Sequence, residues 1–118
     1  CQSTTKIGGL QVASVLDGNE VIAACRETGG SGYLVEDDFV YEVQALLARQ
    51  EGIFCEPAAA VSLAGVLQAA AAGKIQSEET VVCVITGSGF KDQGSIDRML
   101  ADTACPVISL SEFIEQTA

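Results

Sequence analysis

The residues best suited to chemistry stand at the end of an apolar run, where Thr86-Gly87-Ser88-Gly89 directly follows Val81–Ile85. In doubly wound α/β sheets, ligands bind outside the carboxyl ends of the strands, where loops leave the sheet. A hydroxyl there can exchange one hydrogen bond with a ligand, and glycines let that ligand approach the backbone closely. The same residues can also form a plain tight turn in which Thr86 only satisfies its own strand end. Spacing alone leaves both interpretations open.

Several other kinds of site are excluded by the residues present. The order GxxxxGK[ST] does not occur, which excludes a Walker-type phosphate loop. A second glycine cluster, Gly29-Gly30-Ser31-Gly32, precedes an apolar stretch instead of opening a helix, so we interpret it as a turn. The chain has no histidine, which removes Ser-His-Asp and Cys-His nucleophiles and the commonest metal ligand. We therefore expect neither a catalytic residue nor a metal site in this chain.

Composition points to a single globular unit with an acidic surface. The chain has 118 residues, of which 48% are hydrophobic and 19% charged. Its formal net charge of −10 repels nucleic-acid phosphates and anionic membrane surfaces, so neither is an expected partner. Cysteine is present five times, an odd number, and Cys25, Cys55 and Cys83 lie in apolar stretches without CxxC spacing. Buried free thiols in a reducing compartment explain this pattern, and we expect a cytoplasmic protein.

Apolar periodicity predicts several helices. We expect them over residues 17–28, 38–51, 58–73, 95–100 and 111–117, the last capped by Ser111. The second of these carries an apolar stripe formed by Phe39, Val40, Val43, Leu46 and Leu47. Its polar side is expected to carry Glu42, Gln44 and Arg49.

Short apolar runs between these helices predict strands. We expect them over residues 33–35, 81–85 and 107–110, while residues 52–55 form either a very short strand or an extended link. Residues 81–85 are apolar on both alternating faces, which is typical of a strand covered on both sides. Residues 58–73 follow Pro57, are rich in alanine and are apolar around most of the helix, so this helix is expected to be buried between layers. The predicted fold is α/β, a three-layer αβα arrangement with a mostly parallel sheet.

Two motifs in order resemble a known family. "EGIFCEPAAAVSLAGVLQAAAAGKI" followed by "ETVVCVITGSGFKD" is similar to the carboxyl-terminal stretch of threonine synthase and its relatives, the pyridoxal-phosphate enzymes of the tryptophan-synthase-β fold. That family carries EGI..EP(A/S)(A/G)A and then VV…LTGxGLKD. The upstream segment "ETGGSGYLVEDDFVYEVQALLARQEGI" also resembles the family pattern ESGGxxxxVSDEEI…LLAREEGI. The likeness extends from about Asp17 to Asp92.

The resemblance implies cofactor-binding roles for three residues. The threonine of the TGxG motif faces the pyridine nitrogen of the cofactor in threonine synthases, and the matching residue here is Thr86. Gly87 would let the ring lie close to the chain. Glu56 would lie near the cofactor at the start of the buried helix, although it could instead only support that helix N-terminus electrostatically.

The lysine that holds the cofactor and the glycine-rich phosphate cup belong, in this family, to the amino-terminal half. Lys91 matches the lysine of the GLKD motif, with Phe90 in place of leucine, and is not that residue. Neither Lys6 nor Lys74 has a context that suits the role. We therefore expect residues 1–118 to be a single α/β segment from the carboxyl-terminal part of the large domain of a longer enzyme, inactive alone.

The resemblance implies a lyase that converts O-phosphohomoserine to threonine with pyridoxal 5′-phosphate. A threonine or serine dehydratase, or a diaminopropionate ammonia-lyase, is the alternative within the same fold. A stand-alone α/β binding module without chemistry is the alternative from another class. An uncovered sheet edge would drive self-association, so we expect a homo-oligomer whose small-molecule substrate is an amino acid.

Overall fold

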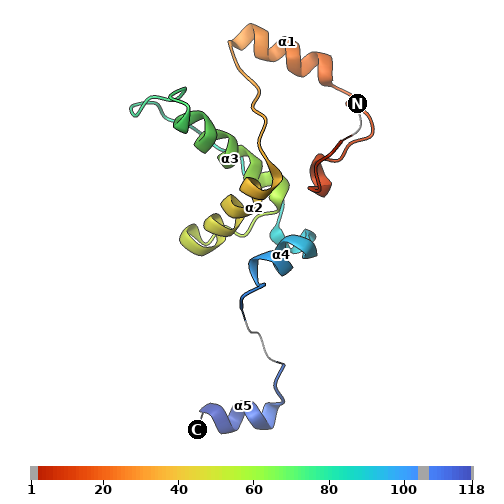
Figure 1. Ribbon diagram of the computed structural model, residues 1–118, viewed down its shortest axis with the longest axis vertical. Helices are drawn as coiled ribbons and strands as arrows, with labels where there is room; N and C mark the ends of the chain where they lie inside the picture. The colour runs from red at the N-terminus through yellow and green to blue at the C-terminus, as the bar shows by residue number, and fades with distance from the viewer. Residues whose placement is uncertain (1–2, 104–106, 118) are drawn as a thin grey trace.

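The computed structural model of the chain describes residues 3–103 and 107–117. Helices dominate these residues, and two of them form a small central core. The helices are α1 (Gly18–Thr28), α2 (Asp37–Leu46), α3 (Pro57–Ala71), α4 (Gln93–Met99) and α5 (Leu110–Thr117). The shape is elongated, 64 × 38 × 19 Å, with α2 and α3 near the centre and α5 at one end (Figure 1).

The predicted three-layer αβα fold with a mostly parallel sheet is wrong, because the described residues form no β-strand. Their one β-bridge is the isolated antiparallel contact between Cys55 and Ser88. Residues 33–35 and 81–85 are not helical, and neither run forms a ladder. A strand needs a neighbouring strand for its N–H and C=O groups, and neither run has one among the described residues. The side chain of Gln68 in α3 donates to the Leu34 carbonyl at 2.9 Å, and Ile85 packs against the central core.

The core lies where α2 packs on α3. Its buried members are Ile7, Val40, Val43, Leu47, Cys55, Ala59, Ala60 and Ala64. The distance between packed helices depends on the side chains at the contact, so the alanines of α3 let the larger α2 side chains lie close to it. Ile7 adds a residue from the amino-terminal segment, directly before the short 3-10 turn Gly8–Leu10, which contacts α3.

The helix predicted over residues 38–51 is confirmed, but its buried face differs from the predicted one. It begins as α2 and continues as a π-helical turn over Leu47–Glu51, which ends at Gly52 with φ +67°. Val40 and Val43 are buried as expected, but so is Gln44, whose exposed fraction is only 1%. Leu46, predicted on the apolar stripe, is 46% exposed. The buried face is therefore rotated from the predicted one, with Gln44 at its centre.

The other predicted helices are also present, with smaller differences. The first ends at Gly29, which has the left-handed φ of +72° that favours glycine at a helix end. The alanine-rich helix α3 buries Ala60 and Ala64 on one face while Leu67 is 42% exposed, so it is not enclosed between layers. Residue 110, expected at the end of a strand, begins α5 instead.

The cap of α5 is Ser109 and not Ser111. The Ser109 hydroxyl accepts from the Glu112 backbone N–H at 3.3 Å, and the Glu112 carboxylate accepts from the Ser109 N–H at 2.7 Å. This reciprocal pair is a capping box. Hydrogen bonds from the Ser109 N–H and hydroxyl lower the pKa of the Glu112 carboxyl.

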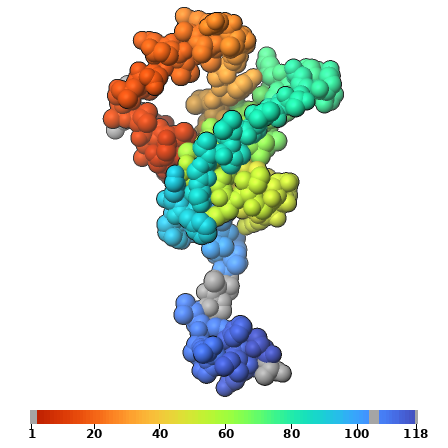
Figure 2. Space-filling view, turned by 180° about the vertical axis from the view of Figure 1, so that it is seen from behind, coloured from red at the N-terminus to blue at the C-terminus, as the bar shows by residue number. Residues whose placement is uncertain are grey.

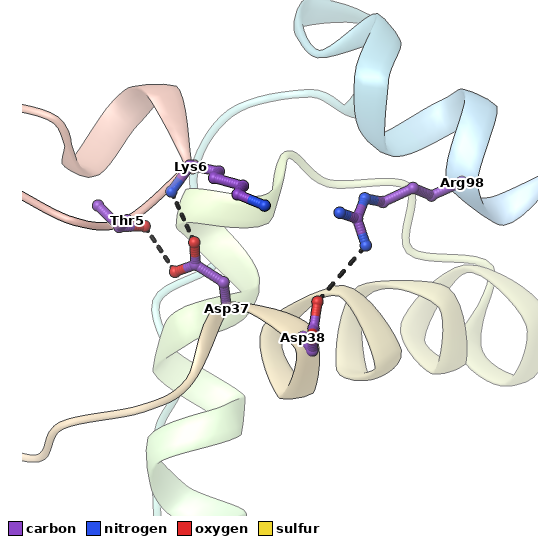
Figure 3. A network of polar contacts seen from close by, with 5 residues as sticks. All are labelled: Thr5, Lys6, Asp37, Asp38 and Arg98. Carbon is purple, nitrogen blue, oxygen red and sulfur yellow. Dashed lines mark hydrogen bonds and ion pairs between the residues drawn. The ribbon is translucent and has the colours of Figure 1, made fainter.

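The start of α2 ties the amino-terminal segment to the core, as Figure 3 shows. The Asp37 carboxylate accepts from the Lys6 backbone N–H and from the Thr5 hydroxyl, each at 2.6 Å. These bonds favour the ionised form and lower the pKa of Asp37. The neighbouring Asp38 lies 3.5 Å from Arg98 of α4, and the Arg98 guanidinium also stacks 4.5 Å above the Tyr41 ring. The amino-terminal segment and α4 therefore meet at the same helix start.

Two further expectations concern cysteines and membranes. Cys25, Cys55 and Cys83 are free thiols, with Cys55 buried and the other two half-buried, while Cys1 and Cys105 lie outside the described residues. Of the helices in residues 3–103 and 107–117, none is long and apolar enough to span a membrane.

Candidate functional site

The turn that follows the apolar run is held against the segment that leads into α3. The Gly89 backbone N–H donates to the Phe54 carbonyl at 3.1 Å, and the Cys55–Ser88 bridge lies beside this bond. The two segments are more than thirty residues apart in the sequence. Their contact unites the two motifs that the sequence singled out separately.

Gly87 and Glu56 are brought together at this contact. Gly87 has φ +63°, a left-handed conformation that side chains other than glycine rarely adopt. A Cβ added to Gly87 would also collide with the Glu56 side chain, whose Cγ would be only 2.8 Å away and whose carboxyl group would be closer still. The space beside Gly87 is therefore filled by the Glu56 carboxyl group. Both backbone angle and available space require a glycine here.

Glu56 occupies the N-cap position of α3, but its side chain makes no cap hydrogen bond. Its Oε2 lies 3.9 Å from the Nζ of Lys91, and the exposed fractions of the two side chains are 22% for Glu56 and 66% for Lys91. An ion pair open to solvent contributes only about 0.2–1 kcal/mol, so packing against Gly87 is the firmer restraint on the carboxylate. Lys91 is thus engaged with Glu56.

Aromatic rings support the turn from the side, a contact that the sequence analysis did not predict. Gly89 is buried, and a Cβ there would lie 2.6 Å from the Phe54 ring. The Phe54 and Phe90 rings meet edge to face, with centroids 4.9 Å apart. The signal for this contact was the phenylalanine that replaces leucine beside Lys91, since an aromatic pair gains from such geometry.

Thr86 lies one residue before this turn and is exposed, as is Gly87. Its hydroxyl is therefore on the surface, where a ligand supplied from outside these residues can reach it. Behind the turn, Cys55 is buried, and burial raises the pKa of its thiol. The site thus has the exposed Thr86 and the Glu56 carboxylate on the outside and the buried Cys55 side chain behind them.

A buried amide lies directly behind the cluster. The Nε2 of Gln44 donates to the Cys55 carbonyl at 2.8 Å and to the Ser95 hydroxyl oxygen at 3.0 Å. Sequence reasoning placed Gln44 on the polar face of its helix and so missed it. Its spacing of four from Val40 and three from Leu47 was the available signal, because such residues share one face.

Comparison with known proteins places the chain in a family. The family described as pyridoxal-phosphate dependent enzyme matches residues 2–87, a range that includes Glu56, Thr86 and Gly87. The chain belongs to the pyridoxal-phosphate dependent enzyme family. This membership confirms the resemblance seen in the motifs.

Relatives within the pyridoxal-phosphate dependent family carry the name threonine synthase. The protein from Bacillus sp. is 38% identical over 95 residues, which cover 80% of this chain and 26% of that protein. The one from Methanocaldococcus jannaschii is 39% identical over 83 residues, or 70% of this chain and 20% of the relative. A Synechocystis protein is also 39% identical, over 70% of this chain and 21% of its own length. The chain therefore spans about a quarter or less of each of these proteins.

The residues at the site suit one edge of the cofactor that gives the family its name. Thr86 offers a neutral hydroxyl, and the glycine after it keeps the adjoining backbone free of a side chain. The carboxylate in the space beside Gly87 has a lysine within ion-pair distance, so its charge is partly balanced. The edge of a neutral aromatic ring can lie against the Thr86 hydroxyl without being next to an unpaired charge, because Lys91 balances the Glu56 carboxylate.

Proposed function

We propose that this chain is part of a pyridoxal-phosphate enzyme that converts O-phosphohomoserine to threonine. The observation that carries the proposal is the 38% identity to the Bacillus threonine synthase across 80% of this chain. The chain carries the EP segment before α3 and the TGSGFKD segment after the apolar run. The contact between these two segments brings both motifs to the same site.

Thr86, Gly87 and Glu56 are the cofactor-binding residues in this proposal. When bound, pyridoxal phosphate supplies an electron sink for elimination and replacement at an amino-acid substrate. The hydroxyl of Thr86 meets the ring nitrogen and, being neutral, does not hold a proton there as a carboxylate would. A ring without that proton withdraws electrons less strongly, which suits elimination and replacement chemistry. Gly87 adds no side chain to the backbone beside the ring. The Glu56 carboxyl group fills the space next to Gly87 and so restrains the turn.

The partners and setting follow from the same proposal. The substrate is a small amino acid, and the residues that hold its phosphate lie outside this chain. The enzyme is cytoplasmic, in keeping with free thiols at Cys25, Cys55 and Cys83. It is also a homo-oligomer, since apolar side chains such as Val82 and Val84 are 84% and 69% exposed here.

Substrate specificity tests the proposal. The natural full-length protein, loaded with pyridoxal phosphate, is incubated separately with O-phosphohomoserine, threonine, serine and diaminopropionate. We expect threonine and inorganic phosphate from O-phosphohomoserine, with at least about a hundredfold preference in kcat/KM over the other three. Production of 2-oxo acid and ammonia from threonine or serine, without phosphate release from O-phosphohomoserine, would assign a dehydratase instead.

The lysines of this chain give a second test. Borohydride reduction of the loaded full-length protein fixes the cofactor to the lysine that holds it, and peptide mass spectrometry then locates the adduct. We expect it outside residues 1–118, because Lys91 is engaged with Glu56 and the resemblance places the lysine that holds the cofactor in the amino-terminal half. An adduct on Lys6, Lys74 or Lys91 would contradict the assigned roles.

A further inference from the structure

The two halves of the candidate site share one support, the side-chain amide of Gln44 in α2. Its Nε2 donates to the carbonyl of Cys55 at 2.8 Å, and Cys55 lies between the two residues that contact the turn, Phe54 and Glu56. The second bond of the same nitrogen goes to Ser95 Oγ at 3.0 Å. Gln44 and Ser95 are each 1% exposed, so water competes little with either bond.

Ser95 connects Gln44 to Asp92, which lies at the far end of the turn. Its hydroxyl donates to the Asp92 carbonyl at 3.0 Å, and its N–H donates to the Asp92 side chain at 2.8 Å. The Asp92 N–H in turn donates to the Gly89 carbonyl at 3.1 Å. A continuous series of hydrogen bonds therefore leads from Gln44 through Ser95 and Asp92 to Gly89, which is itself bonded to Phe54.

The remaining polar atom of this amide shows why a glutamine is needed. The Oε1 of Gln44 is buried and has no hydrogen-bond donor among the described residues. An unsatisfied buried acceptor destabilises the fold, and an apolar side chain of the same size would avoid that cost. The two donor bonds of Nε2 are thus what the glutamine contributes that a methionine or leucine would not.

We propose that Gln44 is a positioning residue for the cofactor site. It fixes the distance between the Phe54–Glu56 segment and the Thr86–Asp92 turn, and so sets where the Thr86 hydroxyl and the Glu56 carboxylate stand. Gln44 is buried behind both segments and touches no ligand itself. The cofactor part of this inference rests on the proposed function, whereas the restraint on the turn does not.

The test uses Gln44→Met in the natural full-length protein, with Gln68→Met as the matched control. Gln68 also donates its side-chain N–H to a backbone carbonyl, that of Leu34 at 2.9 Å, but this bond is exposed and lies on the side of α3 that holds residues 33–35. Hydrogen exchange measured by mass spectrometry on peptides covering Ser88–Asp92 reports the Gly89 N–H. Titration with pyridoxal phosphate and the absorbance of the bound cofactor report the site.

For Gln44→Met we expect exchange at Ser88–Asp92 to rise about tenfold, because both hydrogen bonds of Nε2 are lost. The cofactor should bind about tenfold more weakly, with a shifted absorbance band, and Gln68→Met should change neither. Ser95→Ala, a smaller change, should raise exchange in the same peptides and add little in the Gln44→Met background. This lack of additivity identifies one network.

Unchanged exchange at Ser88–Asp92 in both Gln44→Met and Ser95→Ala would overturn the inference. So would faster exchange with unaltered cofactor affinity and absorbance in a protein that binds pyridoxal phosphate. A full-length protein that binds no pyridoxal phosphate would contradict the proposed function instead, and exchange would still decide whether Gln44 holds the turn.

Discussion

Helix α3 and the segment Val81–Ile85 are both rich in apolar residues but differ in how they are covered. Ala60 and Ala64 of α3 are completely buried, whereas Val82 and Val84 are 84% and 69% exposed. In the view from behind, the chain after α3 runs across the surface of the molecule (Figure 2). Ile85, at the end of this segment, is the residue that packs on the core.

The difference teaches that the two kinds of element need different partners. A helix satisfies its backbone within its own segment and needs cover on only one face, which α2 and α3 give each other. An extended segment must find both a ladder neighbour and cover for its faces. Apolar sequence shows that burial is favourable. It does not show that the covering residues belong to the same stretch of chain.

The largest expected effect comes from two leucines, one buried where α2 continues into the π-helical turn and one exposed in the extended residues 33–35, which like Val81–Ile85 form no ladder. Leu47→Ala removes a side chain that is 6% exposed, and we expect it to lower the free energy of unfolding by about 2–5 kcal/mol. Leu34→Ala removes the same atoms from an 85% exposed site and should change that free energy by less than about 0.5 kcal/mol. Urea denaturation measures both. Equal losses would show that the extended segment is as well covered as the helix pair.

A second prediction concerns Gly87 and has Gly52 as its control. Gly52 has φ +67° and nothing within 4 Å of an added Cβ, so Gly52→Ala should cost only the left-handed conformation, about 1–2 kcal/mol. Gly87→Ala meets the Glu56 side chain as well and should cost about 1–3 kcal/mol more. Adding Glu56→Ala to Gly87→Ala should recover much of that extra cost in urea denaturation. If the two glycine variants lose the same stability, Glu56 does not fill the space beside Gly87.

The smallest effect is a pH dependence at the start of α2. Bonds from the Lys6 N–H and the Thr5 hydroxyl hold the pKa of Asp37 below its unfolded value, which is about 3.9. Its contribution to stability is therefore present above the unfolded pKa and is lost as pH falls through the lower folded pKa. Asp37→Asn should lessen the loss of stability between about pH 6 and about pH 2.

The control for this prediction is Asp38→Asn, because the Asp38 side chain is 88% exposed and contacts only Arg98 among the interactions of Figure 3. It should leave the acid limb of the stability curve nearly unchanged. Identical acid limbs for the wild-type protein and Asp37→Asn would remove Asp37 as the anchor of the amino-terminal segment.

Sequence was a good guide where a signal is local. The helix over residues 17–28 and its end at Gly29 follow from periodicity and a left-handed glycine, both properties of the segment itself. The pairing of the EP and TGSG segments was implied only through resemblance, because nothing local joins residues so far apart. The sheet failed for the same reason, since its ladder partners had to be assumed.

Gln44 shows a different limit. Its residue type suggested a solvated face, while its spacing from Val40 and Leu47 placed it on the buried one, and spacing was the better guide. A polar residue can occupy a core face when its hydrogen bonds are made there, and those partners, Cys55 and Ser95, come from other elements. Ser109 was missed as the cap of α5 because residues 107–110 were predicted to be a strand, which left Ser111 as the first candidate cap.

The protonation state of the cofactor tests the central claim most directly. The natural full-length protein and its Thr86→Asp and Thr80→Asp variants are loaded with pyridoxal phosphate isotopically labelled at the ring nitrogen and observed by NMR. We predict an unprotonated ring nitrogen in the wild-type protein and in Thr80→Asp, and a protonated one in Thr86→Asp, where a carboxylate replaces the hydroxyl. A ring-nitrogen signal that is the same in all three proteins would contradict the placement of Thr86 beside the ring.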